Sequence, residues 1–117
     1  NITAERLRFD FSHSEKLTDD QLKQVSDIVN QQIKSSLIVT KETIPFTQAQ
    51  KDGAIAFFGS KYPEIVSVYT IGPKDSYFSK EVCTGPHVNN TNELGIFEIT
   101  KEESAGSGKR RIYAVLK

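Results

Sequence analysis

The chain has 117 residues with 15 basic and 15 acidic side chains, which suits one domain over residues 1–117 and argues against a strongly basic nucleic-acid module. A single cysteine excludes an internal disulfide and fits a reducing compartment, and the longest apolar run, Ala54–Phe58, is far too short to cross a bilayer. Composition therefore predicts a small cytoplasmic domain without a membrane partner.

The first predicted elements are a strand and a long helix. Leu7–His13 alternates apolar and polar side chains, which predicts a half-buried strand with His13 on its apolar face. Thr18 and Gln21 form the pattern of a capping box, so a helix is expected to begin after Thr18 and to end near Lys34–Ser36. The helix has one predicted buried stripe, made of Leu22, Val25, Ile28, Val29 and Ile33.

Shorter elements are expected in the middle of the chain. β-Branched residues predict a strand at Leu37–Ile44, and Phe46–Asp52 is interpreted as a short helix that stops at Gly53. Ala54–Phe58 fits either a helix or a strand, because short apolar runs do not distinguish the two. Two further strands are predicted, at Ile65–Ile71 and Ser76–Val82.

The last third of the chain combines a loop with a hairpin. Cys83–Asn92 is rich in Gly, Pro, Asn and Thr and is predicted to be irregular. Two strands, Ile96–Lys101 and Arg110–Leu116, are expected on either side of a flexible polar connection at Ser104–Gly108. Since strands outnumber helices, the predicted fold is α+β, with a mostly antiparallel sheet packed against one long and one or two short helices.

The sharpest chemical feature is the run from Cys83 to His87. Thiolate and imidazole are usual zinc ligands, and Gly85 and Pro86 between them allow the chain to turn back. The alternative interpretation is a buried thiol with a surface histidine nearby. Zinc needs at least three protein ligands, and the chain offers only one further histidine, His13, which is interpreted as a histidine satisfied in the core or at a strand edge.

A three-residue basic run is the second candidate site. Lys109, Arg110 and Arg111 either flank a solvated hairpin or contact a phosphate backbone. In a strand, Arg110 and Arg111 must point to opposite faces, so at most one of them serves a given surface. A phosphate loop at Ser107-Gly108-Lys109 is rejected, because Arg110 stands where that motif requires Ser or Thr.

Motifs in six segments, in order along nearly the whole chain, share one further pattern. They are Leu7-Arg8-Phe9-Asp10-Phe11-Ser12-His13; Val29-Asn30 with Gln32-Ile33; Gly53-Ala54-x-Ala56-x-Phe58-Gly59-x-Lys61-Tyr62; Ser79-x-x-x-Cys83-x-Gly85-x-His87; Gly95-x-Phe97-x-Ile99; and Gly108-x-Arg110-Arg111-Ile112-x-Ala114-Val115. Together they resemble the C-terminal portion of the editing (second additional) domain of alanyl-tRNA synthetases, which is related to free-standing alanyl-tRNA editing proteins and to the editing domain of threonyl-tRNA synthetases.

The resemblance implies a two-layer α+β fold and hydrolysis of the ester that joins serine or glycine wrongly to alanine tRNA. It also implies zinc, held in that family by a His-x-x-x-His pair and a Cys-x-x-x-His pair. Cys83 and His87 match the second pair, and no His-x-x-x-His occurs in the sequence. The chain is therefore expected to be a fragment of an ATP-dependent alanine–tRNA ligase that lacks the first pair, and to bind zinc weakly or not at all alone.

The expected partners are alanine tRNA and the remainder of the synthetase, with neither DNA nor a membrane. Two alternatives stay open. Gly85-Pro86-His87-Val88 looks more like the threonyl relatives than the usual Cys-Gly-Gly-Thr-His of alanyl synthetases, so a threonyl-type editor is one. The other is a non-catalytic fragment that contacts tRNA through Lys109 and either Arg110 or Arg111, or is only structural.

Overall fold

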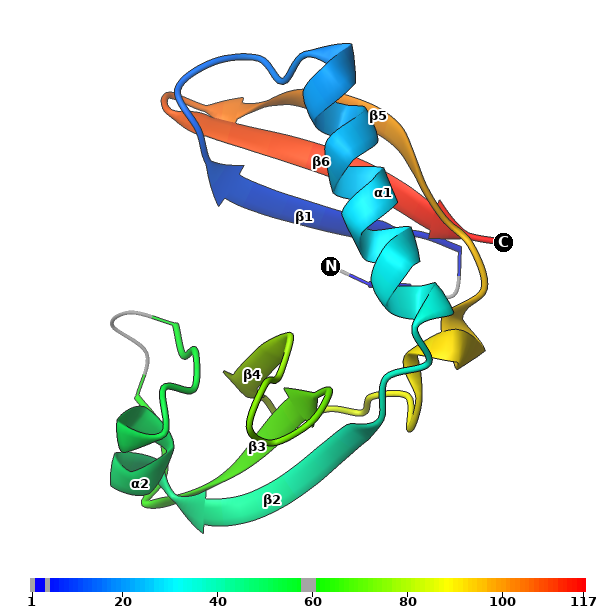
Figure 1. Ribbon diagram of the computed structural model, residues 1–117. Helices are drawn as coiled ribbons and strands as arrows, with labels where there is room; N and C mark the ends of the chain where they lie inside the picture. The colour runs from blue at the N-terminus through cyan, green and yellow to red at the C-terminus, as the bar shows by residue number, and fades with distance from the viewer. Residues whose placement is uncertain (1, 4, 58–60) are drawn as a thin grey trace. The chain divides into compact units, whose positions relative to one another are not determined.

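In a computed structural model, which describes residues 2–3, 5–57 and 61–117, the chain forms two compact units, each with a three-stranded antiparallel sheet (Figure 1). Unit 1 comprises the residues up to Ser35 together with Leu94–Lys117, and unit 2 is Ser36–Glu93. The predicted α+β class is confirmed, although the strands divide between two sheets. Phe58 and Gly59 of the third motif, and with them the end of the apolar run, lie outside the described residues.

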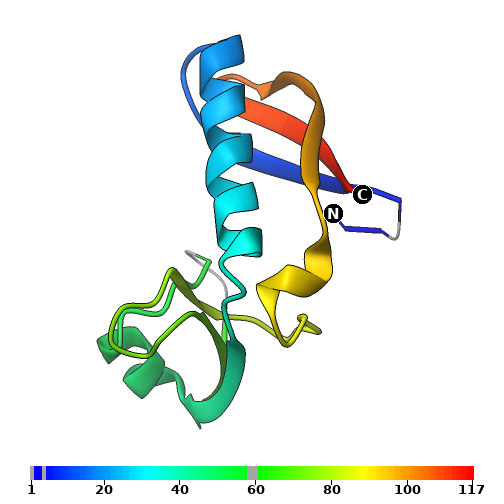
Figure 2. The same cartoon turned by 45° about the vertical axis from the view of Figure 1, so that its right-hand side comes forward.

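Unit 1 consists of a sheet and one long helix. Its strands are β1 (Leu7–Ser12), β5 (Phe97–Gly106) and β6 (Lys109–Leu116), in the order β1-β6-β5, and its helix is α1 (Asp19–Lys34). The helix lies across one face of the sheet (Figure 2). The buried core between them is formed by Ile33, Phe97 and Ala114, with Leu7, Val29, Leu94 and Ile99 packed around it.

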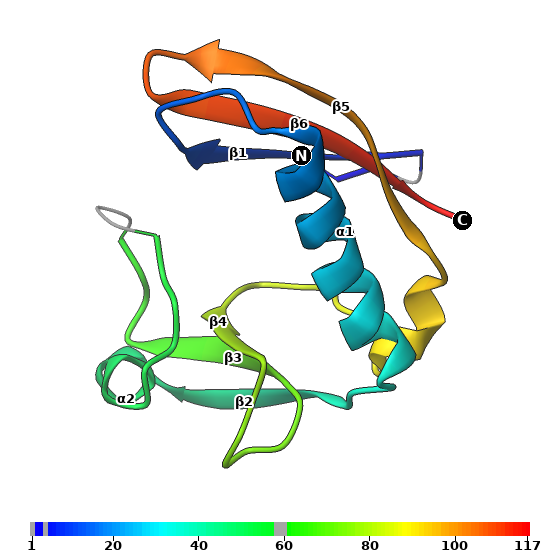
Figure 3. The ribbon, with the colours of Figure 1, turned by 45° about the horizontal axis from the view of Figure 1, so that its top comes forward.

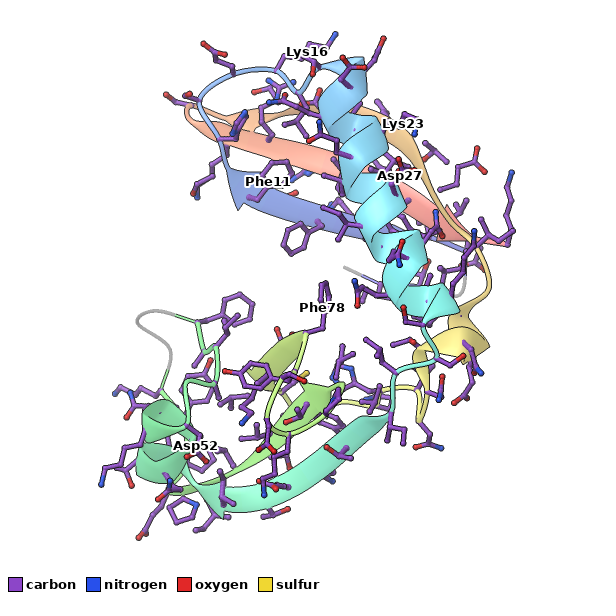
Figure 4. All side chains as sticks on the ribbon, in the orientation of Figure 1. Phe11, Lys16, Lys23, Asp27, Asp52 and Phe78 are labelled. Atoms are coloured by element: carbon purple, nitrogen blue, oxygen red, sulfur yellow. The ribbon has the colours of Figure 1, made fainter. Side chains whose placement is uncertain are left out.

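The start of α1 is as the sequence predicts. Thr18 Oγ1 accepts a hydrogen bond from the Gln21 N–H at 3.1 Å, and Gln21 Oε1 accepts one from the Thr18 N–H at 2.9 Å, which completes the capping box. The predicted stripe is wrong at Ile28, which is 53% exposed. At 3.6 residues per turn, Ile28 lies roughly 100° around the helix from the centre of the buried face. The side of α1 opposite the buried face is exposed to solvent and carries the Lys23–Asp27 ion pair (Figure 4).

The C-terminal hairpin is longer and tighter than predicted. Strand β5 continues to Gly106, and only Ser107 and Gly108 form the turn, so Ser104–Gly106 belongs to the ladder and not to a flexible connection. Ser104 is paired with Arg110, and irregular steps between Ile99 and Lys101 and between Ser104 and Gly106 absorb the extra residues. The polar composition of this segment reflects its position at the end of the hairpin.

Unit 2 is built on the sheet β2-β3-β4. Its elements are β2 (Val39–Pro45), α2 (Phe46–Lys51), β3 (Ile65–Ile71) and β4 (Ser79–Val82), and a 3₁₀ turn at Thr91–Leu94 spans the boundary with unit 1. Figure 3 shows the three strands, with α2 directly after β2. The core is formed by Ala49, Val66 and Val68, against which Ile44, Phe46, Ala54, Tyr62 and Val82 pack.

All four predicted elements of unit 2 with an assigned type are present, although several of their boundaries differ from the prediction. β3 is confirmed at both ends, and α2 ends one residue before the predicted Asp52. β2 begins two residues later than predicted, and β4 begins at Ser79 rather than Ser76. The ambiguous apolar run is neither helix nor strand in its described part, where Ile55 makes a single parallel bridge to Glu81. No described helix has the length and the apolar character needed to span a membrane.

Asn30 joins α1 to the first residue of β5. Its side-chain amide donates to the Phe97 carbonyl oxygen at 3.0 Å, and its carbonyl oxygen accepts from the Phe97 N–H at 2.8 Å. Phe97 itself is buried, so without Asn30 its backbone groups would face a region that water does not readily reach.

Replacing Asn30 with Ala should lower the free energy of unfolding by about 2 kcal/mol, because two backbone groups of Phe97 lose their partner. Chemical denaturation of the full chain measures this change. The matched control is Gln31→Ala, an exposed position on the same helix, which should leave the midpoint almost unchanged. Equal losses in the two variants would contradict the assigned role of Asn30.

Glu102 ties the hairpin to the residue before the helix cap. Its carboxylate accepts hydrogen bonds from Arg110 Nε at 2.7 Å, Arg110 Nη2 at 2.8 Å and the Leu17 N–H at 3.2 Å. The side chain of Glu102 is only 3% exposed. The Arg110 guanidinium, and to a smaller extent the Leu17 N–H, lowers the pKa of Glu102 from 4.5 to about 2.

This lowered pKa predicts how stability depends on pH. The unfolded chain takes up the Glu102 proton at higher pH than the folded chain, so the contribution is complete above about 4.5 and is lost as pH falls toward about 2. The thermal midpoint of Glu102→Gln should lie below that of the wild type at pH 7, and the two should converge between these limits. A constant difference down to pH 2 would contradict the assignment.

Candidate metal centre

Cys83 and His87 lie at the two ends of a tight turn after β4. The Cys83 N–H still donates to the Ser67 carbonyl oxygen of β3 at 3.1 Å, so the sheet fixes the start of the turn. Gly85 has a φ of +72°, which favours glycine, and its peptide bond to Pro86 is cis. The Gly85 N–H donates to Cys83 Sγ at 3.4 Å, which orients the sulfur within the turn.

Glu81 joins the two predicted ligands. One donor atom from each of Glu81, Cys83 and His87 lies within 4.8 Å of the other two. Among the residues that the structure describes, no other group of three or more Cys, His, Asp or Glu side chains comes together in this way. Sequence analysis missed Glu81. The available signal was its spacing, because residues two apart on an extended strand share a face and Glu81 stands two before Cys83.

The three donors fit zinc by type. A thiolate, an imidazole and a carboxylate are all zinc ligands, and three protein ligands with a fourth position open is the usual arrangement of a catalytic zinc. Tetrahedral bonds of the usual length place ligand atoms about 3.6 Å apart, so atoms within 4.8 Å of one another need only small side-chain rotations to share one ion. The cluster is therefore suited to zinc in its chemistry and its spacing.

A cavity of about 380 Å³ adjoins Cys83 within unit 2. Apolar side chains dominate its wall, which is lined by Phe57, Tyr62, Pro63, Ile65, Val66, Ser67, Val82, Cys83 and Thr84. The Tyr62 hydroxyl accepts a hydrogen bond from the Phe57 N–H at 2.8 Å, which joins two residues of the lining. A space of this size accommodates a small ligand group next to the thiol.

Unit 2 also has a larger hollow, of about 690 Å³, lined by residues that include Ile38, Thr40, Thr70 and Lys80. None of the three donors borders it. We therefore choose the candidate cavity by its lining and not by its volume. The smaller cavity is the candidate site, because Cys83 lines it.

The basic run does not form an open cationic patch. Arg110 is paired with Glu102, and Arg111 is paired with Asp10 through Nε at 2.7 Å and Nη2 at 2.9 Å. The two arginines therefore point to different partners, as the strand period predicts. The hydrogen bond to Asp10 raises the pKa of Arg111, and the hydrogen bond to Arg111 lowers the pKa of Asp10. A phosphate would have to compete with these carboxylates.

The remaining predicted residues lie in unit 1. Lys109 is exposed at the start of β6. The ring centroid of His13 lies 6.5 Å from that of Phe11, and the His13 N–H donates to the Gly108 carbonyl oxygen at 3.1 Å. His13 is not a member of the three-donor cluster. Contact of the basic run with tRNA stays a prediction.

Comparison with known proteins gives one consistent result. The model of the family described as "Threonyl and Alanyl tRNA synthetase second additional domain" matches residues 66–113, the stretch that contains β3 except its first residue, β4 and all three donors.

Individual relatives cover almost the whole chain. The alanine–tRNA ligase of Borrelia garinii subsp. bavariensis is 62% identical over 116 residues, and that of Treponema denticola is 56% identical over 116 residues, each covering 99% of this chain. The alanine–tRNA ligase of Bacillus subtilis is 45% identical over 114 residues, 97% of the chain. The chain spans only 19% of the length of the first two relatives and 12% of the third.

Zinc titration by calorimetry tests the cluster directly. The full chain should bind zinc weakly and one-to-one, Cys83→Ala and His87→Ala should abolish the heat signal, and Glu81→Gln should weaken binding, because each removes one donor. Glu64→Gln, at an exposed position before β3, is the matched control and should bind as the wild type does. Binding that survives in Cys83→Ala would show that the donors are elsewhere.

Proposed function

Since the chain belongs to the second additional domain family of threonyl- and alanyl-tRNA synthetases, we propose that it is part of the editing domain of an alanine–tRNA ligase. In this proposal the domain hydrolyses the ester of serine or glycine attached wrongly to alanine tRNA. The observation that carries the proposal is the convergence of Glu81, Cys83 and His87, of which Cys83 also lines a cavity of about 380 Å³.

Cys83 and His87 would hold the zinc ion, with Glu81 as a third donor in this chain. Bound there, zinc would supply a Lewis acid that polarises an ester carbonyl or a water molecule. In the whole synthetase a His-x-x-x-His pair from the remainder of the protein is proposed to complete the four-coordinate site in place of Glu81, which accounts for the weak binding expected of the chain alone.

The chain's own residues supply the framework around this centre. The Gly85 N–H holds Cys83 Sγ at 3.4 Å, and the bond from the Cys83 N–H to Ser67 anchors the turn to the sheet. Mostly apolar side chains line the cavity next to Cys83, and the hydrogen bond from the Phe57 N–H to the Tyr62 hydroxyl joins two of these lining residues. An ester presented at this wall would be held in one orientation, and orientation lowers the entropic part of the barrier to hydrolysis.

Discrimination explains why an alanine enzyme needs such a domain. A synthetic site built for alanine cannot strongly reject serine, which only adds a hydroxyl, so a second, hydrolytic site removes the errors. That site can bind the serine hydroxyl directly, and alanine would leave its polar groups unpaired. The proposed partners are thus alanine tRNA and the remaining parts of the synthetase, where ATP would be used for aminoacylation.

Two alternatives have specific support. The run Gly85-Pro86-His87-Val88 favours a threonyl-type editor, which would act on mischarged threonine tRNA instead. The exposed Lys109 favours a fragment that only contacts tRNA, although Arg110 and Arg111 are already paired with carboxylates. The substrate that is hydrolysed separates the first alternative from the proposal, and turnover separates the second.

Deacylation of seryl-tRNA by the synthetase that contains this chain tests the proposal. His87→Ala should slow hydrolysis of serine from alanine tRNA at least about 100-fold, because a metal ligand is lost. Cys83→Ala should slow it to the same extent. The matched control is His13→Ala, which removes the other histidine of the chain and should retain the wild-type rate.

Other outcomes would contradict the proposal. Salt-sensitive tRNA binding without turnover in the wild type would support the tRNA-contact fragment. Hydrolysis confined to seryl-threonine tRNA would support the threonyl-type editor.

A further inference from the structure

Tyr69, in β3, contacts His87, one of the three donors of the candidate metal centre. Its ring centroid lies 4.1 Å from that of His87, with the two planes tilted by 43°. On the ladder between β3 and β4, Tyr69 is the direct partner of Glu81. The Tyr69 side chain therefore adjoins two of the three donors, although it was not singled out as a functional residue by its sequence context.

The same ring occupies the space beneath Gly85. A Cβ atom placed on Gly85 would come within 2.3 Å of the Tyr69 Oη and 2.9 Å of its Cζ, distances at which something must move. Glycine at this position is thus required twice, by its φ of +72° and by the ring beneath it. The turn between Cys83 and His87 rests on the phenol ring.

We propose that Tyr69 is a positioning residue of the metal centre, which sets the orientation of the His87 imidazole and the path of the turn at Gly85. Its action at zinc rests on the proposed function, whereas its action on His87 in the metal-free chain does not. A ring that holds the imidazole in its binding orientation reduces the conformational entropy that the histidine loses when the metal binds. The affinity for the metal therefore rises without any new bond to it.

The packing of the sheet distinguishes this role from ordinary core packing. The core of unit 2 lies on the face of β3 that carries Val66 and Val68, where α2 covers it. Tyr69 is an odd number of residues from both, so its side chain leaves the opposite face of the strand. Glu81 pairs with Tyr69 on the ladder, and Gly85 and His87 lie against its ring, so all three neighbours are in or next to the turn.

Nuclear magnetic resonance of the metal-free 117-residue chain tests the contact. Wild type should show a nuclear Overhauser effect between the Tyr69 and His87 rings, because their centroids are 4.1 Å apart. The His87 ring signals should move in Tyr69→Leu. They should also move in Gly85→Ala, where the added Cβ displaces the ring but leaves both residues in place. Two variants keep the test decisive if one of them unfolds.

Zinc titration of the same samples, followed through the His87 ring signals, tests the consequence. Tyr69→Leu should raise the dissociation constant about tenfold, as loss of a residue that orients a ligand commonly does, and Tyr69→Phe, which keeps the ring, should restore most of the affinity. The matched control is Tyr77→Leu. Tyr77 lies in unit 2 but contacts Lys80, whose Nζ is 4.6 Å from its ring centroid, and the variant should bind zinc as the wild type does.

The outcomes separate the two proposals. Absence of the ring contact in the wild type, or unchanged His87 signals in both Tyr69→Leu and Gly85→Ala, overturns the positioning role. Wild-type zinc affinity in Tyr69→Leu also overturns it. A wild-type chain that shows the ring contact but binds no zinc overturns the three-donor site in the isolated chain, while the metal-free spectra still decide the role of Tyr69.

Discussion

The candidate centre depends on the antiparallel pairing of β3 with β4. This ladder sets Tyr69 opposite Glu81, and the hydrogen bond from the Cys83 N–H to Ser67 extends it by one residue beyond the strand. Because the period of a strand is two, Glu81 and Cys83 share one face, while Val82 between them packs into the core. One register thus serves both the stability of unit 2 and the position of two donors, and a one-residue slip would bury the donors and expose the core.

The turn completes what the ladder begins. His87 is four residues after Cys83, and only a tight reversal brings the imidazole back to the thiol. Gly85 makes the reversal through its positive φ, and its N–H meets the sulfur. The donors are close in sequence and anchored to a sheet, so little of the chain must become ordered when an ion binds. In this sense the site is preorganised.

The local features of the fold and of the candidate site could be predicted from the sequence alone. The capping box at Thr18, the strand at Ile65–Ile71 and the Cys83–His87 pair are local patterns, and local geometry decides them. The division into two sheets, the length of β5 and the inclusion of Glu81 and Tyr69 depend on which strands pair. Pairing is a long-range property that periodicity does not encode, and the ring beneath Gly85 has no signature in sequence.

The chain leaves unit 1 and returns to it at two positions that are held by hydrogen bonds. The chain leaves unit 1 after α1 and returns at Leu94, and Leu37 and Thr91 exchange hydrogen bonds of 2.9 Å where unit 2 opens and closes. Asn30 fixes the first residue of β5 independently of that excursion. The segment that carries the donors thus leaves and rejoins the chain at one point, which the paired Leu37 and Thr91 close, while Asn30 holds β5 to α1 within unit 1.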